Sequence, residues 1–151
     1  MEKIKINSII EIAGKPEAHV TETLEKMMDI LKKNDKITIV KNEIAPTKKV
    51  EMPHPSNPEE KVEIYSSFVD LELDFPSLDE LMQFCFAFMP SSIEVVEPKA
   101  LKIDQKDLEN PLNDLLGRLH HQAKIIMEYS ALKQQIEKFQ PQKTSSSQKE
   151  N

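Results

Sequence analysis

Four segments of the chain carry the apolar pattern of β-strands. Isoleucines occupy most even positions of residues 3–12, and polar side chains occupy most of the odd ones. In residues 61–75 the alternation is clearest, with apolar side chains at odd positions from 69 onward and carboxylates between them. A period of two is typical of a strand with one buried face. Two further strands are predicted, one at residues 36–40 or, if it continues to Ile44, at 36–44, and one at residues 91–103 with a break at Pro98.

Two segments carry the apolar spacing of amphipathic helices. Pro16 suits the first turn of a helix, and apolar residues follow it at intervals typical of one helical face. Ser77 followed by Glu80 is a capping-box sequence, and Pro90 ends the second pattern. We therefore predict helices over residues 16–33 and 77–88. The apolar positions of the first helix are Val20, Leu24, Met27, Met28 and Leu31.

The order of these elements predicts the fold class. Strand, helix, two strands, helix and strand follow one another within residues 1–103, which is the order of the ferredoxin-like βαββαβ plait. We expect an α+β domain with a four-stranded antiparallel sheet and both helices on one face. In this plait the strands at residues 4–12 and 69–75 are neighbours in the centre of the sheet. The acidic side of residues 61–75 is then expected on the other face.

Prolines interrupt the chain between the second and third predicted strands. Residues 45–60 contain four of them together with scattered charges. Proline does not fit a helix interior or a central strand, because it has no backbone N–H to donate. We therefore predict a long, exposed proline-rich loop over residues 45–60.

The last third of the chain predicts one long helix over residues 104–140. Asn110-Pro111 is a good helix start, and Gly117 is the only poor helix former that follows it. Apolar residues then recur at spacings of 4, 3, 4, 3, followed by 3, 3, 4, 3, which is typical of a coiled coil with a three-residue stammer. Residues 141–151 have the composition of a disordered tail. The apolar positions are Leu112, Leu116, Leu119, Ala123, Ile126, Tyr129, Leu132, Ile136 and Phe139.

Charge and composition make several partners unexpected. The net charge is −6, and residues 1–103 hold 13 Lys and no Arg against 19 acidic residues. Nucleic acids and anionic membranes are bound largely through cationic side chains, so neither is expected as a partner. The N-terminal residues lack the apolar run of a signal peptide, and no segment is long and apolar enough to span a membrane. With a lone cysteine, Cys85, this composition predicts a cytoplasmic protein.

Residues that often carry chemistry are placed unfavourably for it. His120 and His121 are adjacent and point about 100° apart on a helix, whereas two ligands on one helical face need a spacing of three or four. His19 and His54 belong to no metal-binding motif. Cys85 lies among phenylalanines, where burial disfavours the reactive thiolate. We therefore predict no metal, cofactor-binding or catalytic residues.

Two further ligand motifs are absent. The chain has only Gly14 and Gly117, so it contains neither a P-loop nor a dinucleotide-binding fingerprint.

RNA-recognition domains share the predicted plait and stack bases on aromatic residues of its middle strands. Tyr65 and Phe68 occupy opposite parities of one strand, so only one of them can face outward. Asp70, Glu72 and Asp74 form an acidic row, which we interpret as a solvated sheet face.

Two segments carry a resemblance to known proteins. The sequence FCFAFMPSSIEVVEP, followed by NDLLGRLHH and a coiled-coil pattern, resembles small archaeal proteins that have no assigned activity. At the level of the fold, the plait resembles regulatory domains of the ACT type. That resemblance implies a small ligand near the turn after the first strand, where Gly14 stands. Ala13 occupies the place of the acidic residue typical of that turn.

Together these features predict a non-enzymatic interaction module. We expect the long helix to mediate self-association as a homo-oligomer, or to dock on a partner helix in a larger assembly, because a domain of this size cannot cover its whole apolar stripe. The alternative is a small-molecule-sensing domain of ACT type with its ligand near Gly14. The predicted interface residues are Leu119, Ile126, Tyr129, Leu132, Ile136 and Phe139.

Overall fold

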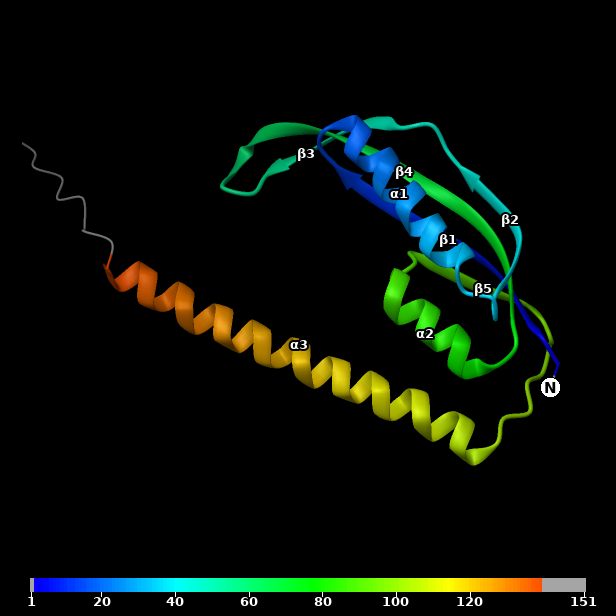
Figure 1. Ribbon diagram of the computed structural model, residues 1–151. Coiled ribbons are helices and arrows are strands. Elements are labelled where there is room, and N and C mark those ends of the chain that lie inside the picture. Colours follow the sequence, from blue (N-terminus) through cyan, green and yellow to red (C-terminus); the bar gives the residue numbers. More distant parts are fainter. Residues whose placement is uncertain (1, 140–151) are drawn as a thin grey trace, which may run out of the picture. The chain divides into compact units, whose positions relative to one another are not determined.

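The computed structural model describes residues 2–139, which form two compact units (Figure 1). The first unit ends at Pro111 and the second begins at Leu112, and each is described by itself. None of the helices in residues 2–139 is both long and apolar enough to cross a membrane. The elements are β1 (Ile4–Gly14), α1 (Glu17–Lys32), β2 (Thr38–Ile44), β3 (Lys48–His54), β4 (Asn57–Phe75), α2 (Leu78–Phe88), β5 (Ser92–Glu97) and α3 (Gln105–Phe139).

The first unit is built on an antiparallel sheet. Its strands lie in the order β2-β4-β1-β5, and β3 pairs with β4. The central pair is β1 with β4, in a register that sets Ile4 opposite Phe75 and Ile10 opposite Val69. This pairing confirms that the two clearest alternating segments are sheet neighbours.

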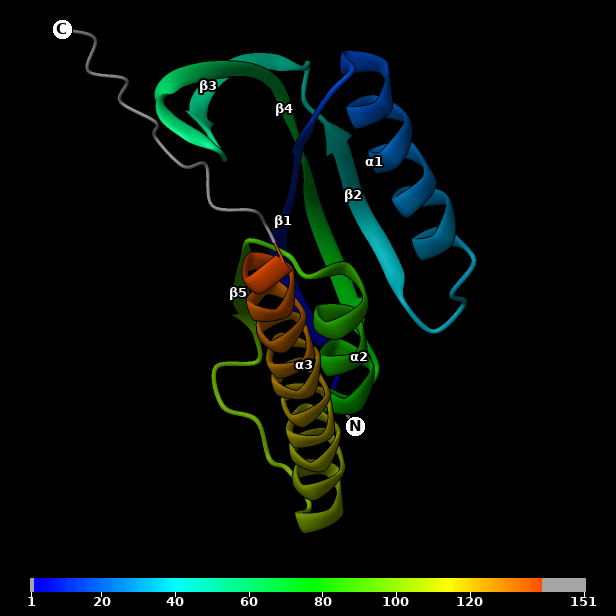
Figure 2. The same ribbon diagram turned by 90° about the vertical axis from the view of Figure 1, so that its left-hand side faces the viewer.

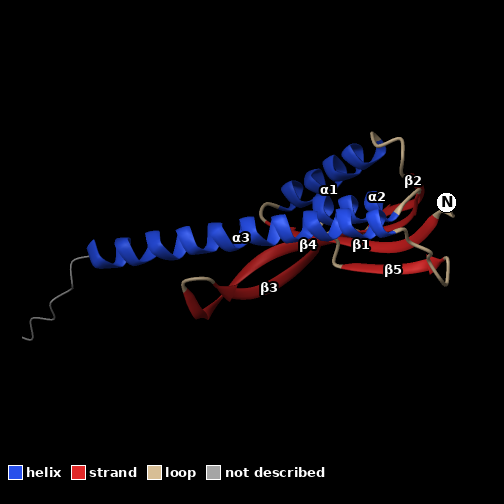
Figure 3. Cartoon of the chain, turned by 90° about the horizontal axis from the view of Figure 1, so that it is seen from below, coloured by secondary structure: helices blue, strands red, loops and turns tan. Residues whose placement is uncertain are grey.

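The hydrophobic core lies on one face of this sheet. Even positions of β1 and odd positions of β4 supply its strand side, as the two alternations predict. Both α1 and α2 cover this face (Figure 3). Phe84 of α2 packs against Phe75 of β4 with ring centroids 5.4 Å apart. The buried apolar residues of the two helices are Val20, Leu24, Met28, Leu31, Leu81 and Phe84.

Local signals fix the ends of α2 as predicted. The Ser77 hydroxyl accepts a hydrogen bond from the Glu80 backbone N–H at 3.3 Å, which caps the first turn. Glu80 does not complete a capping box, because its carboxylate pairs with Lys36 at 2.7 Å. At the other end Met89 adopts the left-handed conformation, with φ of 44°, and its N–H donates to the Cys85 carbonyl at 3.0 Å.

The sheet has five strands, so the prediction of four is wrong. The segment predicted as a proline-rich loop, residues 45–60, contains β3 and the start of β4, which form a hairpin that curves away at one end of the sheet (Figure 2). The prolines are tolerated because β3 pairs only with β4 and is therefore an edge strand. Pro46 precedes β3, and Pro55 lies in the turn between the two strands.

The long C-terminal helix predicted over residues 104–140 is confirmed, although Asn110-Pro111 lies inside the helix and does not start it. α3 begins at Gln105 and reaches Phe139, the last residue that the structure describes, with Pro111 inside it. Because proline has no N–H, Pro111 removes one intrahelical hydrogen bond, the one to the Asp107 carbonyl. The boundary between the two compact units follows Pro111 directly. Residue 140 and the predicted tail, residues 141–151, lie outside the described residues.

Candidate interaction surface on the C-terminal helix

The predicted interface residues all lie on α3, which is one uninterrupted helix from Gln105 to Phe139. The large apolar side chains at the predicted stripe positions are about half exposed or more, from 47% at Leu112 to 86% at Phe139. A single helix cannot bury its own apolar side chains, so only a second element could cover this surface.

Because α3 is continuous, each residue adds about 100° of rotation around its axis. Ile126 and Leu132 are six residues apart, so they point about 120° away from each other. The nine positions predicted as one stripe with a stammer therefore cannot share one face of this helix. Including Ile125, which is 50% exposed, shows what they form instead.

The apolar positions of α3 form two seams with the same spacing of 4, 3, 4, 3. The second seam repeats the first after 13 residues, which places it about 140° around the helix axis. We name them by their order in the chain. The proximal seam is Leu112, Leu116, Leu119, Ala123 and Ile126, and the distal seam is Ile125, Tyr129, Leu132, Ile136 and Phe139.

The distal seam begins where the proximal seam ends. Continued toward the C-terminus, the heptad of the proximal seam reaches Ser130 and Lys133, which are polar. Continued toward the N-terminus, the heptad of the distal seam reaches Gln122 and Arg118. Each seam therefore spans two heptads, about 21 Å of helix.

The two seams differ in the charges that flank them. In heptad terms the first and fourth positions, a and d, form a seam, and positions e and g flank it. The proximal seam has no Lys, Arg, Asp or Glu at its flanking positions, which are Asn113, Leu115, His120, Gln122, Met127 and Tyr129. The distal seam has Glu128 at a g position and Lys133 at an e position. Within α3, Glu128 lies 3.9 Å from Lys124, a loose contact between exposed side chains.

A comparison with known protein families matches residues of both units. A model of the MJ0538 family matches residues 5–144, a range that includes the sheet and the whole of α3. The chain belongs to the MJ0538 family. This membership confirms the family resemblance drawn from the segments around Phe84 and Leu116. No curated protein and no solved structure matches the chain.

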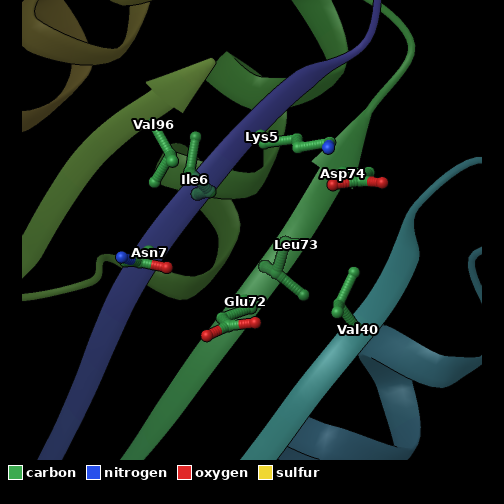
Figure 4. Close-up of a pocket in the computed structure, with 8 residues that line it drawn as sticks. All are labelled: Lys5, Ile6, Asn7, Val40, Glu72, Leu73, Asp74 and Val96. Atoms are coloured by element: carbon green, nitrogen blue, oxygen red, sulfur yellow. The ribbon is translucent and has the colours of Figure 1, made fainter.

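Outside α3, this MJ0538-family chain has an open hollow on the sheet face that α1 and α2 leave uncovered (Figure 4). Acidic side chains of β4 and residues of β1 line it, among them Glu72, Asp74 and Asn7. Two lysines near it are already paired: Lys5 with Glu97 at 3.0 Å, and Lys41 with Asp70 at 2.9 Å.

The charges around this hollow are those of a solvated face. The hydrogen bond and charge of Glu97 raise the pKa of Lys5, and the hydrogen bond to Asp70 raises the pKa of Lys41. Both amino groups are therefore held in their charged form. Within the described residues, every buried side-chain nitrogen or oxygen has a hydrogen-bond partner. Among these residues the hollow therefore contains no buried side-chain polar group without a hydrogen-bond partner.

The histidines, which could bind a metal or act in catalysis, are separated from one another or exposed. His19 and His54 lie on α1 and β3, and the Nδ1 of His54 accepts a hydrogen bond from the Ser56 N–H at 3.1 Å. His120 and His121 are both exposed on α3. Among residues 2–139, no three His, Cys, Asp or Glu side chains are grouped so that they could hold a metal ion.

Cys85 and Gly14 occupy structural positions. Cys85 is partly buried against the core, and this burial raises the pKa of its thiol. A raised thiol pKa lowers the fraction of reactive thiolate at neutral pH. Gly14 ends β1 opposite Tyr65, and a methyl group added there would meet no atom within 4 Å. The fold therefore does not require glycine at this turn.

Proposed function

We propose that this protein is a non-enzymatic interaction module that self-associates through α3. The observation that supports the proposal is the pair of regular heptad seams on one continuous helix, with side chains about half exposed or more. Burying a Leu, Ile or Phe side chain stabilises an interface by about 1.5–3 kcal/mol. The distal seam carries four such residues in about 21 Å of helix.

A second copy of the chain is the occupant that the heptad spacing favours. Two helices with the same repeat of 4 and 3 residues pack knobs into holes along their whole contact. Two heptads are short for an isolated coiled coil, since sustained pairing usually extends over at least about three. We therefore expect a reversible dimer whose population rises with protein concentration.

We further propose that the sheet unit is a ferredoxin-like plait with an inserted hairpin. If β3 is set aside, β1, β2, β4 and β5 follow the chain order and sheet order of that plait, with α1 and α2 on one face. In this proposal the plait is a cytoplasmic structural body and carries no active site. The alternative of an ACT-type sensor with a ligand near Gly14 stays a prediction that no feature of the described residues favours.

Light scattering across a range of protein concentrations tests the proposed self-association. The expected result is a mass that rises from one chain toward two as the concentration increases. A mass of one chain at every concentration would overturn it. Thermal unfolding at the same concentrations checks the result independently, because the stability of a self-associating protein depends on its concentration.

A further inference from the structure

Resting on the proposed self-association, we infer that two copies pair in parallel and in register through the distal seam. In this seam Tyr129 and Ile136 are a positions, and the d positions are Ile125, Leu132 and Phe139. A β-branched residue at a with leucine at d favours a two-stranded parallel coiled coil, and Ile136 with Leu132 meets this preference.

Charge complementarity selects the parallel orientation. In a parallel, in-register pair, a g position faces the e position five residues further along the partner helix. Glu128 at g and Lys133 at e are five residues apart. Glu128 of each copy therefore faces Lys133 of the other, and twofold symmetry makes this contact twice.

The antiparallel orientation loses both contacts. There, e positions face e positions and g positions face g positions. The only charged e residue of the distal seam is Lys133, and the only charged g residue is Glu128. Each would face either a residue of its own charge or an uncharged one.

The proximal seam has no charged residues that would favour the parallel over the antiparallel orientation. Its flanking positions carry no Lys, Arg, Asp or Glu, so no charge contact favours one orientation over the other. It also lies about 140° around the helix from the distal seam, so two straight helices cannot use both seams in one contact. The charges on the chain therefore assign the parallel contact to the distal seam.

Charge reversal in the full-length protein tests the pairing. Glu128→Lys and Lys133→Glu, each alone, place like charges across both contacts and are expected to raise the dimer dissociation constant by about tenfold. The double variant restores opposite charges and is expected to return the constant close to that of the parent. Circular dichroism verifies that the helix persists in each variant. A double variant that dissociates at least as readily as the single ones would overturn the inference.

Cysteine cross-linking then separates the two orientations. In a Cys85→Ala background, Ile125→Cys lies beside its own copy in a parallel pair and is expected to form a disulfide dimer under mild oxidation. In an antiparallel pair an a position faces a d position, so the same residue lies beside Ile136, and cross-links would form only when Ile125→Cys and Ile136→Cys proteins are mixed. Gln134→Cys, on the outer side of the helix, is the matched control and is expected to stay uncross-linked.

These outcomes distinguish the inference from the proposed function. If light scattering shows a dimer but only the mixed cross-link forms, the proposed self-association holds and the parallel register is overturned. If Leu119→Asp dissociates the dimer and Leu132→Asp does not, the assignment of the contact to the distal seam is overturned. A chain that is monomeric at every concentration overturns both the inference and the proposed function.

Discussion

Ile125 and Ile126 are neighbours on α3, yet they belong to different seams. Ile126 ends the proximal seam and Ile125 begins the distal one, and the two side chains point about 100° apart. Before this point the apolar side chains of the proximal seam lie on one side of the helix, and after it those of the distal seam lie on another. A single helix can thereby present two separate contact surfaces in 35 residues.

Substitution within the distal seam should dissociate the dimer. We expect Leu132→Asp combined with Ile136→Asp to give a single-chain mass at concentrations where the parent is dimeric. Each removed side chain contributes about 1.5–3 kcal/mol when buried, and the new carboxylates cannot be buried without partners. Light scattering measures the outcome.

The matched control for this prediction is Gln134→Asp. It introduces a carboxylate between the same two residues but on the outer side of the helix, about 200° from Leu132. Its mass should equal that of the parent. Equal dissociation by Gln134→Asp would show that negative charge on the helix, and not the seam, controls association.

The core contact between Phe75 and Phe84 should be a major source of stability. Phe84 is 2% exposed, and its ring lies 5.4 Å from that of Phe75. Phe84→Ala is expected to lower the free energy of unfolding by about 3–5 kcal/mol, because it removes apolar contacts and leaves a cavity. Urea unfolding monitored by circular dichroism measures this.

Phe68→Ala supplies the comparison, because Phe68 is 43% exposed on the face of the sheet opposite α1 and α2. Its substitution should lower the free energy of unfolding by less than about 1 kcal/mol. A loss as large as that for Phe84→Ala would mean that another element covers this face.

The end of the β3–β4 hairpin should be dispensable for folding. Replacing residues 54–60 with Asn-Gly joins Pro53 to Lys61, which are already paired across the hairpin, through a turn that suits two-residue connections. The unfolding free energy should change by less than about 1 kcal/mol, because the side chains removed are largely exposed and loop length has little effect. A loss above about 2 kcal/mol would mean that this end packs on another element.

Cys85 should react slowly with thiol reagents in the native protein. Burial raises its pKa, so less thiolate is present at neutral pH than for a free cysteine, and the native rate should rise only at a higher pH. Labelling rates with and without denaturant, measured from pH 7 to pH 10, check this. Labelling of the native chain at pH 7 as rapid as that of the unfolded chain would contradict it.

The sequence by itself determined the central strand pair and the position of the helices. In β1 and β4 the alternation of apolar and polar side chains has a period of two, which specifies the buried face of each strand. The register, with Ile4 opposite Phe75, came from the structure, because a slip by two residues keeps the same side chains on the buried face. Ser77 similarly determined the start of α2, because a cap acts through the next three residues only.

The fifth strand was decided only by the tertiary structure. The prolines of residues 45–60 carry the same local signal whether the chain forms a loop or an edge strand. Only pairing with the N-terminal half of β4, from Lys48 opposite Ser66 to Pro53 opposite Lys61, distinguishes the two. That pairing depends on residues on the far side of the turn and on the absence of another neighbour for β3 among the described strands.

The predicted interface residues come from the sequence, whereas their proposed division into two seams depends on the conformation of the helix. The apolar spacing identified Leu119, Ile126, Tyr129, Leu132, Ile136 and Phe139 without coordinates. A stammer and two overlapping seams both account for these six positions, since spacing alone does not reveal whether a helix overwinds. α3 continues without interruption through Ile126 and Leu132, and at the ordinary rotation of about 100° per residue these side chains point to different sides, which favours two seams.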